Sequence, residues 1–360
     1  MSGSSFGKIF RLHTFGESHG VAIGGIIDGC PAGLEVDAAR VQRELDLRKP
    51  GQSTLTSARA EDDRIEILSG IFQGKTTGAP IGFIIRNKDQ RSSDYDQLSG
   101  AYRPSHADYT YEKKYGTRDH SGGGRSSARE TACRVAAGAI ARIFLEQMGI
   151  SIAAYVRQVG EIGVTADHST LDLASTYSNA VRCPEKGTAE KMTTLIEEAR
   201  SQGDTVGGII QCVIKGLPVG FGEPVFDKLH ALLGHAMLSI NAVKGFEVGS
   251  GFYGATRRGS QENDVFEPDD SGGIRTRTNN SGGIQGGISN GMPVVVNVAF
   301  KPVSTLMREQ QTVDRSGTPV KINPGGRHDP CVLPRAVPVV EAMAALVIAD
   351  CALMARSARI

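Results

Sequence analysis

Tryptophan is missing from this 360-residue chain, and aromatic residues make up only 6% of it. Basic and acidic side chains nearly cancel, with 40 Lys+Arg against 39 Asp+Glu and a formal net charge of +1. Proteins dedicated to nucleic acids usually combine a basic excess with aromatic side chains that stack on bases. Both signals are weak here, so we expect no nucleic-acid partner.

Cysteine pairs at metal-ligand or redox spacing are also missing. The six cysteines are scattered along the chain without a CxxC pair. This pattern disfavours a disulfide framework or a zinc site, and it indicates reduced thiols in a cytosolic protein with no metal.

Neither an export signal nor a membrane span is evident. The first apolar run is interrupted within about twenty residues by charged side chains and histidines. The most apolar stretch, residues 337–353, contains Glu341 and Asp350, which makes it too short and too polar to span a bilayer. We expect a cytoplasmic protein without a membrane partner.

Signatures of nucleotide-binding folds are incomplete. No GxGxxG follows a strand, which argues against a Rossmann site. Residues 70–76, GIFQGKT, imitate a P-loop but place three residues between the glycines where the P-loop needs four. We interpret this segment as a turn between strands, which makes a P-loop phosphotransferase the weaker alternative.

Hydrophobic periodicity predicts interleaved helices and strands in one α+β domain spanning residues 1–360. Helical spacing of apolar residues is found at 36–49, 127–148, 188–202, 226–243 and from about Pro334 almost to the C-terminus. Short apolar runs predict strands at 21–27, 65–68, 81–85, 208–215 and 293–300. The polar residues 51–64 are typical of a loop.

Glycine is abundant, with 45 residues, and clusters at 121–124, 271–273 and 281–291. Glycine lets the backbone approach a ligand closely or adopt a positive φ. Composition alone leaves open whether these clusters bind a ligand or only form tight turns.

Two histidines lie in polar segments that suit proton transfer. His19 is in GESHG at 16–20, where flanking glycines indicate an exposed imidazole on a tight turn. His106 is in RPSHADY at 103–109, and Pro104 favours a loop there. An Arg, a His and an Asp so close together can bind a phosphate and protonate it. The alternatives are a turn histidine bonded to backbone and a solvated loop with a local ion pair.

The segment 118–134, RDHSGGGRSSARETACR, carries the strongest signal. A glycine run and two serines, Ser126 and Ser127, lead into the strongest predicted helix. Cations at a helix N-terminus face the positive end of the helix dipole, which is unfavourable unless an anion lies between them. We therefore predict a phosphate or carboxylate site, in preference to a solvated helix start, around three arginines: Arg125, Arg129 and Arg134.

Two C-terminal loops add further polar groups. Residues 301–305, KPVST, follow a predicted strand and offer a cation and two hydroxyls. Residues 325–331, GGRHDPC, gather a cation, an imidazole and a carboxylate, and Asp329 there could be a desolvated base.

These segments resemble the signatures of the chorismate synthase family. GESHG at 16–20 runs into VAIGGIIDGCP, and GRSSARETACRVAAGAI at 124–140 and RHDPCVLPRAVPVVEAM at 327–343 are similar to the second and third signatures. The resemblance extends in order from residue 6 to about residue 350.

The resemblance implies a β-α-β sandwich, with helices between antiparallel sheets, that assembles as a homotetramer. It also implies a lyase of the shikimate pathway, which leads to the aromatic amino acids. The reaction is the 1,4-anti elimination of phosphate from 5-enolpyruvylshikimate-3-phosphate to chorismate, and it depends on reduced FMN. A substrate with a phosphate and two carboxylates accounts for the arginines. A non-catalytic RNA-binding protein is the other alternative, disfavoured by the net charge.

The resemblance also implies roles for individual residues. His19 protonates the flavin, His106 protonates the departing phosphate, and Asp329 assists proton removal through flavin N5. Substrate or NADPH contacts fall on Arg48, Arg129 and Arg134. FMN contacts fall on Arg125, Ser126, Ser127, Asn241, Ala242, Gly286, Lys301, Pro302, Val303, Ser304, Thr305 and Arg327.

One position departs from the family pattern. Many members carry an arginine six residues after the position of Arg48, where this chain has Thr54 and its nearest downstream arginine is Arg59. An NADPH contact in this loop is therefore in doubt. We expect an external flavin reductant, with NADPH in an indirect role.

Overall fold

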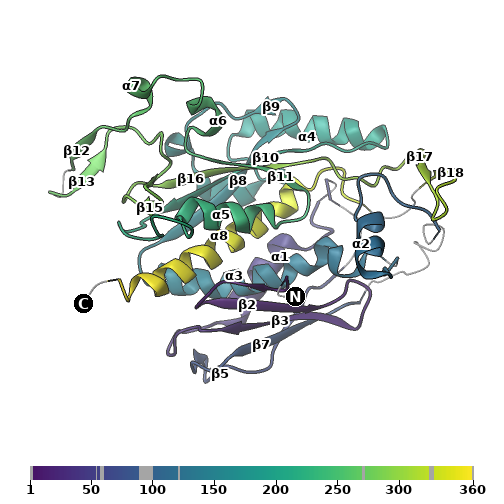
Figure 1. Ribbon diagram of the computed structural model, residues 1–360, viewed down its shortest axis with the longest axis horizontal. Coiled ribbons are helices and arrows are strands. Elements are labelled where there is room, and N and C mark those ends of the chain that lie inside the picture. Colours follow the sequence, from purple (N-terminus) through teal and green to yellow (C-terminus); the bar gives the residue numbers. More distant parts are fainter. Residues whose placement is uncertain are drawn as a thin grey trace.

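Two five-stranded antiparallel sheets enclose a layer of helices (Figure 1). The computed structural model describes residues 3–53, 55–56, 61–88, 100–120, 122–269, 272–323 and 328–358. The strand orders are β1-β2-β3-β7-β4 and β11-β16-β10-β8-β9. This β-α-β sandwich confirms the predicted α+β fold.

The first sheet places the GESHG segment at the ends of two of its strands, because residues 17–20 lie in the loop of the β2–β3 hairpin. Its strands are β1 (Ser5–Phe6), β2 (Arg11–Gly16), β3 (Ala22–Asp28), β4 (Ile65–Ile67) and β7 (Ile81–Arg86). The P-loop-like segment forms a hairpin of β5 (Ile71–Phe72) and β6 (Lys75–Thr76). The predicted turn between strands is therefore confirmed.

The second sheet contains two strands that the sequence predicted, β10 (Gly208–Lys215) and β16 (Val294–Phe300). Three others were not predicted: β8 (Ser151–Val159), β9 (Ile162–Gly163) and β11 (Val243–Val248). Small separate hairpins are β12 (Phe266–Pro268) with β13 (Ile274–Thr276), β14 (Ile284–Gln285) with β15 (Ile288–Ser289), and β17 (Gln310–Val313) with β18 (Pro319–Ile322).

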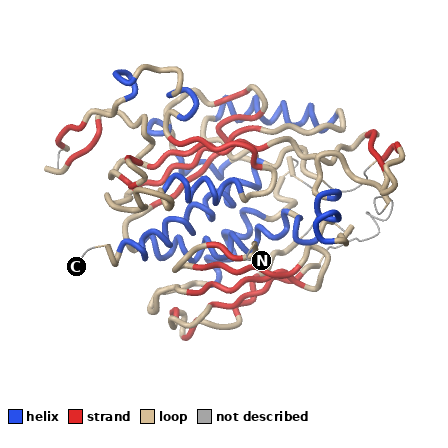
Figure 2. Tube along the Cα trace, viewed as in Figure 1, coloured by secondary structure: helices blue, strands red, loops and turns tan. Residues whose placement is uncertain are grey.

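The inner helical layer consists of α1 (Ala38–Arg48), α3 (Thr131–Glu146), α5 (Leu229–Leu238) and α8 (Leu333–Ala355). Helix α4 (Lys186–Ser201) packs against β8 and β9, and α2 (Asp108–Tyr115) lies at one end of the sandwich (Figure 2). Helices α6 (Gly251–Gly254) and α7 (Gly259–Glu262) lie with the β12–β13 hairpin on an arm that projects from the body. Short 3-10 turns are η2 (Gly124–Ser126), η3 (Ala128–Glu130), η4 (His168–Thr170) and η5 (Leu173–Ser178).

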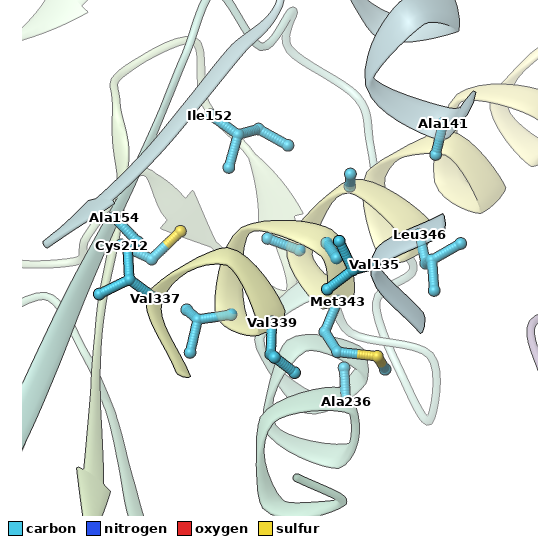
Figure 3. Packing of buried hydrophobic residues seen from close by; sticks show 14 of the residues in the cluster. Val135, Ala141, Ile152, Ala154, Cys212, Ala236, Val337, Val339, Met343 and Leu346 are labelled. Atoms are coloured by element: carbon cyan, nitrogen blue, oxygen red, sulfur yellow. The ribbon is translucent and has the colours of Figure 1, made fainter. Parts of the chain in front are cut away.

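Helix α8 is the centre of the core and packs on α3, α5, β8 and β10 (Figure 3). It crosses α3 so closely that a Cβ on Gly138 would lie 2.4 Å from the Cβ of Ala342, so only glycine fits there. The helix has 23 residues and, by length and composition alone, is long and apolar enough to cross a membrane, so the prediction that this stretch is too short and too polar to do so was wrong. Burial explains its composition, since 89% of its most apolar stretch lies inside the protein.

The two acidic residues of α8 both accept hydrogen bonds inside the protein. Asp350 accepts hydrogen bonds from the N–H groups of residues 8, 9 and 10, which fastens the start of the chain to the core. Glu341 accepts from the Ala154 N–H at 2.8 Å and from the Tyr177 hydroxyl at 2.7 Å. These donors offset part of the cost of burying the two carboxylates, although burial still raises the pKa of Glu341.

Two predicted helices are shorter than their apolar patterns suggest. The helix predicted at 127–148 begins as an α-helix only at Thr131, because η2 and η3 occupy residues 124–130. The helix predicted at 226–243 ends at Leu238, and Ala242 beyond it has a left-handed φ of 70°. The predicted loop at 51–64 falls partly on residues 54 and 57–60, which lie outside the described residues.

Candidate active site

A cavity of about 380 Å³ opens where α8 begins. Its wall combines the end of α1, the loop before α2, residues 122–131, the loop between α5 and β11, and the run after β16. The structure therefore brings most of the predicted site residues to one place. Those that line the cavity are Arg48, His106, Ser126, Ser127, Arg129, Asn241, Ala242, Lys301, Val303, Ser304, Thr305 and Asp329.

Arg48 and Arg129 form a pair of buried cations at this cavity. Both donate to the carboxylate of Asp63, Arg48 through Nη1 at 2.7 Å and Arg129 through its own Nη1. Burial lowers the pKa of Arg48 to about 10, while Asp63 acts in the opposite direction. The two guanidinium groups thus stay close together although they repel each other.

A third guanidinium reaches the cavity from α8. Arg335 donates from Nη1 to Asp329 Oδ2 at 2.5 Å and from Nε to the Arg48 carbonyl at 3.2 Å. The sequence suggested Arg327 as the cation nearest Asp329, but Arg327 lies outside the described residues. The structure identifies Arg335 as a partner of this carboxylate.

His106 is oriented by a buried carboxylate two residues along the chain. Its Nδ1 lies 2.9 Å from Asp108 Oδ1, and Arg103 donates to both oxygens of the same carboxylate, from Nε to Oδ2 and from Nη2 to Oδ1, each at 2.8 Å. Burial alone would raise the pKa of Asp108, but the bonds from Arg103 and His106 hold that pKa well below its ordinary value. The contact between Nδ1 and Asp108 fixes the orientation of the imidazole ring, and Nε2 takes no part in that contact.

His19 lies behind the cavity wall. Its Nδ1 is 3.2 Å from the Ser18 hydroxyl, and its ring packs directly on Gly122, which lines the cavity. Gly122 has a φ of 82°, and a Cβ there would lie 2.1 Å from His19 Cε1. The glycine run at this point is therefore required both by backbone conformation and by contact with the imidazole.

Arg125, Arg129 and Arg134 do not surround one anion, although the sequence predicted that they would. Only Arg129 lines the cavity. Arg125 donates to the Gly16 carbonyl and to the Thr14 hydroxyl, on β2. Arg134 pairs with Glu130 at 2.9 Å and with the Ser239 hydroxyl at 2.7 Å. The late start of α3 explains the difference, because residues 124–130 wind through two 3-10 turns before the helix begins.

The loop between α5 and β11 offers features that suit a bound ligand. The Asn241 amide donates to the Ser126 carbonyl at 3.1 Å, while its buried Oδ1 has no hydrogen-bond partner among the described residues. Ala242 adopts a left-handed backbone, and its carbonyl accepts from the Lys301 N–H at 2.9 Å. Burial, with a smaller effect of Lys244, lowers the pKa of Lys301. An orphaned acceptor and local backbone strain are typical of binding sites.

Other predicted residues lie away from this cavity or cannot be placed. Gly286, with a φ of 61°, forms the turn of the β14–β15 hairpin, and Pro302 is the member of the 301–305 run that does not line the cavity. Thr54 and Arg59, like Arg327, lie outside the described residues. Arg103 and His328, which belong to the predicted polar loops, also line the cavity, and so do two residues for which the sequence predicted no role, Glu61 and Arg335. The clearest missed signal was Arg335, directly after Pro334 at the start of the predicted C-terminal helix.

Fold and cavity together define a protein that can bind a ligand with several negative charges. A sequence profile of the family described as chorismate synthase matches residues 10–353. The chorismate synthase of Christiangramia forsetii is 61% identical over 360 residues and is covered completely, as is this chain. That of Parabacteroides distasonis is 61% identical over 347 residues, covering 96% of this chain and 97% of the relative. A crystal structure of chorismate synthase superimposes with a TM-score of 0.77 at 32% identity, covering 97% of this chain and 93% of the other.

The chain belongs to the chorismate synthase family. Members of this family are lyases of aromatic amino acid biosynthesis that use reduced flavin. Their reaction is the 1,4-anti elimination of phosphate from 5-enolpyruvylshikimate-3-phosphate, which gives chorismate. The protein is therefore an enzyme, a carbon-oxygen lyase that acts on a phosphate ester.

Proposed function

We propose that the 380 Å³ cavity binds 5-enolpyruvylshikimate-3-phosphate together with reduced FMN. The observation that carries this proposal is the group of three guanidinium side chains, Arg48, Arg129 and Arg335, at one cavity. The substrate carries a phosphate and two carboxylates, so three fork-shaped cations match its charge and its geometry. The cavity lining carries five Arg or Lys side chains against two carboxylates, which favours an anionic ligand over a neutral or cationic one.

We assign His106 to the departing phosphate. The bond between its Nδ1 and Asp108 fixes the ring, so that Nε2 can deliver a proton to the leaving oxygen. Arg103 keeps the Asp108 carboxylate in place by donating to both of its oxygens. The pair is comparable to other histidine–carboxylate arrangements in which the acid orients the base.

The residues present fit a flavin. Asn241 Oδ1 is a buried acceptor without a partner among the described residues, and it would take a ring N–H of the flavin. Lys301, whose backbone is tied to Ala242, would face the flavin phosphate or its electron-rich ring. Reduced FMN, when bound, supplies electron density to the substrate ring as phosphate leaves and accepts the ring proton. The residues assigned to hold it are Ser126, Ser127, Asn241, Ala242, Lys301, Val303, Ser304 and Thr305.

Asp329 and His19 are assigned to proton handling. Asp329 lines the cavity and is anchored by Arg335, so its carboxylate can take up a proton at a fixed position. His19 packs on Gly122, which lines the cavity, and the family resemblance supports its role in protonating the flavin. The family resemblance alone supports flavin contacts for Arg125, Gly286, Pro302 and Arg327. It also implies a substrate contact for Arg134, but that side chain pairs with Glu130 and Ser239 away from the cavity, so we propose that it serves the scaffold instead.

Flavin difference spectroscopy tests this proposal. FMN bound to the protein should change its absorption when the enolpyruvyl substrate is added, because both occupy the same cavity. A phosphotransferase or an RNA-binding protein would show no such change. If bound FMN is insensitive to saturating substrate, the shared cavity is refuted.

We further propose that the chain is one domain that assembles as a cytoplasmic homotetramer and receives its electrons from an external flavin reductant. One continuous hydrophobic cluster joins both sheets and the helical layer, which supports a single domain. Exposed apolar side chains on the projecting arm, such as Phe252 and Ile274, support association. Sedimentation should give the mass of four chains. NADPH and FMN without a separate reductase should give little turnover.

A further inference from the structure

Asp63 is a buried carboxylate that the preceding assignments do not use. It lies two residues before β4, its side chain is fully buried, and its backbone has a left-handed φ of 45°. The carbonyl of Asp63 accepts from the Gln42 amide at 3.2 Å, which ties the residue to α1. A strained backbone that the surroundings hold in place is a common feature of functional sites.

The two oxygens of Asp63 serve two different arginines. Oδ2 accepts from Arg48 Nη1 at 2.7 Å, and Oδ1 accepts from Arg129 Nη1. For Arg48, Asp63 is the one carboxylate within ion-pair distance among the described residues. Each oxygen therefore fixes one guanidinium group, and the carboxylate sets the spacing between them.

The outer sides of both guanidinium groups are also held. Arg48 Nε donates to the Thr131 hydroxyl at 3.0 Å, and Arg129 Nε donates to Asn87 Oδ1 at 2.9 Å. Without the carboxylate between them, the repulsion between the two like charges would favour conformations in which they lie farther apart. Burial tends to raise the pKa of Asp63, but Arg48 and Arg129 outweigh it and lower that pKa.

We propose that Asp63 is a positioning residue, which holds Arg48 and Arg129 side by side so that together they bind one anionic group of the substrate. This inference rests on the proposed function of the cavity. For the effect of removing Asp63 on anion binding, it predicts the opposite of what charge balance alone predicts. Removing a negative charge from a cationic cavity should strengthen anion binding, whereas removing the group that positions two cations should weaken it.

The test compares Asp63→Asn with Asp62→Asn. Asp62 is the adjacent residue, is 66% exposed and pairs with Lys88 at the surface, so it controls for the loss of one carboxylate nearby. The inhibition constant of orthophosphate and the KM of the substrate should both rise at least about tenfold in Asp63→Asn, the loss expected for one charge-assisted hydrogen bond. The kcat should change much less, and Asp62→Asn should match the wild type. A merely structural role would lower the melting temperature without this split between KM and kcat.

Asp63→Glu provides a second variant that retains the charge if Asp63→Asn does not fold. Its extra methylene shifts the carboxylate, so positioning predicts a raised KM, whereas a role as counter-charge alone predicts no change. The inference is overturned if neither constant rises in the folded variant, or if orthophosphate binds more tightly. If the wild type makes no chorismate, the proposed function fails separately, and orthophosphate affinity alone decides the role of Asp63.

Discussion

Replacing Gly122 by alanine tests whether the position of His19 matters for the reaction. The new Cβ would lie 2.1 Å from His19 Cε1, so the imidazole must move by roughly 1 Å to restore ordinary contact. Misplacing a group that takes part in catalysis by about 1 Å can cost on the order of 10²-fold in rate, equivalent to about 2.7 kcal/mol in the barrier. We therefore expect Gly122→Ala to reduce kcat by about that factor.

The matched control is Gly116→Ala. Gly116 follows α2 with a φ of 74°, close to the 82° of Gly122, but an added Cβ there meets nothing within 4 Å. Both variants should lose roughly 1–2 kcal/mol of stability because alanine is strained at positive φ. Only Gly122→Ala should lose activity, measured as anaerobic chorismate formation with reduced FMN. In a His19→Ala background, Gly122→Ala should cost little more. Equal activity of the two glycine variants would refute the reasoning.

Three further predictions follow from individual contacts. Asp329→Asn should bind FMN nearly normally yet lose about 10²-fold or more in single-turnover chorismate formation; recovery at saturating FMN would mean that Asp329 only shapes the flavin site. Arg129→Ala should raise the substrate KM, whereas Arg134→Ala, whose side chain lies outside the cavity, should leave KM unchanged; equal effects in steady-state kinetics would contradict the placement. Because Asp108 has a lowered pKa in the folded state, its stabilisation is complete above the unfolded value of about 3.9 and is lost as the pH falls below it. The urea midpoint should therefore drop more from pH 5 to pH 3 in the wild type than in Asp108→Asn.

The helices and strands that were predicted correctly are those whose pattern of apolar residues is uninterrupted. Strands β10 and β16 and helix α8 lie where apolar runs placed them. Strand β8 was missed although Gly149 and Gly160 flank it, because it pairs with β10 over separations of 49 to 64 residues, which no local pattern reveals. The start of α3 was placed too early because 3-10 turns and an α-helix share the same polar, small residues at their beginning.

The site was predictable as a set of segments but not as a geometry. His106 and Asp329, which the sequence motifs singled out, both line the cavity. The direction of Arg134 depends on Ser239, and that of Arg48 depends on Asp63, and neither pairing is visible from local sequence. Arginine side chains are long, so the partner that fixes each one decides whether it serves the ligand or the scaffold.

The most direct test of the account is an anaerobic assay of the purified protein with 5-enolpyruvylshikimate-3-phosphate and reduced FMN, oxidised FMN or no flavin. Chorismate and inorganic phosphate are measured together, because elimination must release them in equal amounts. The account predicts equal formation of both products with reduced FMN and neither product under the other two conditions. Substantial chorismate formation without flavin, or phosphate release without chorismate, would contradict it.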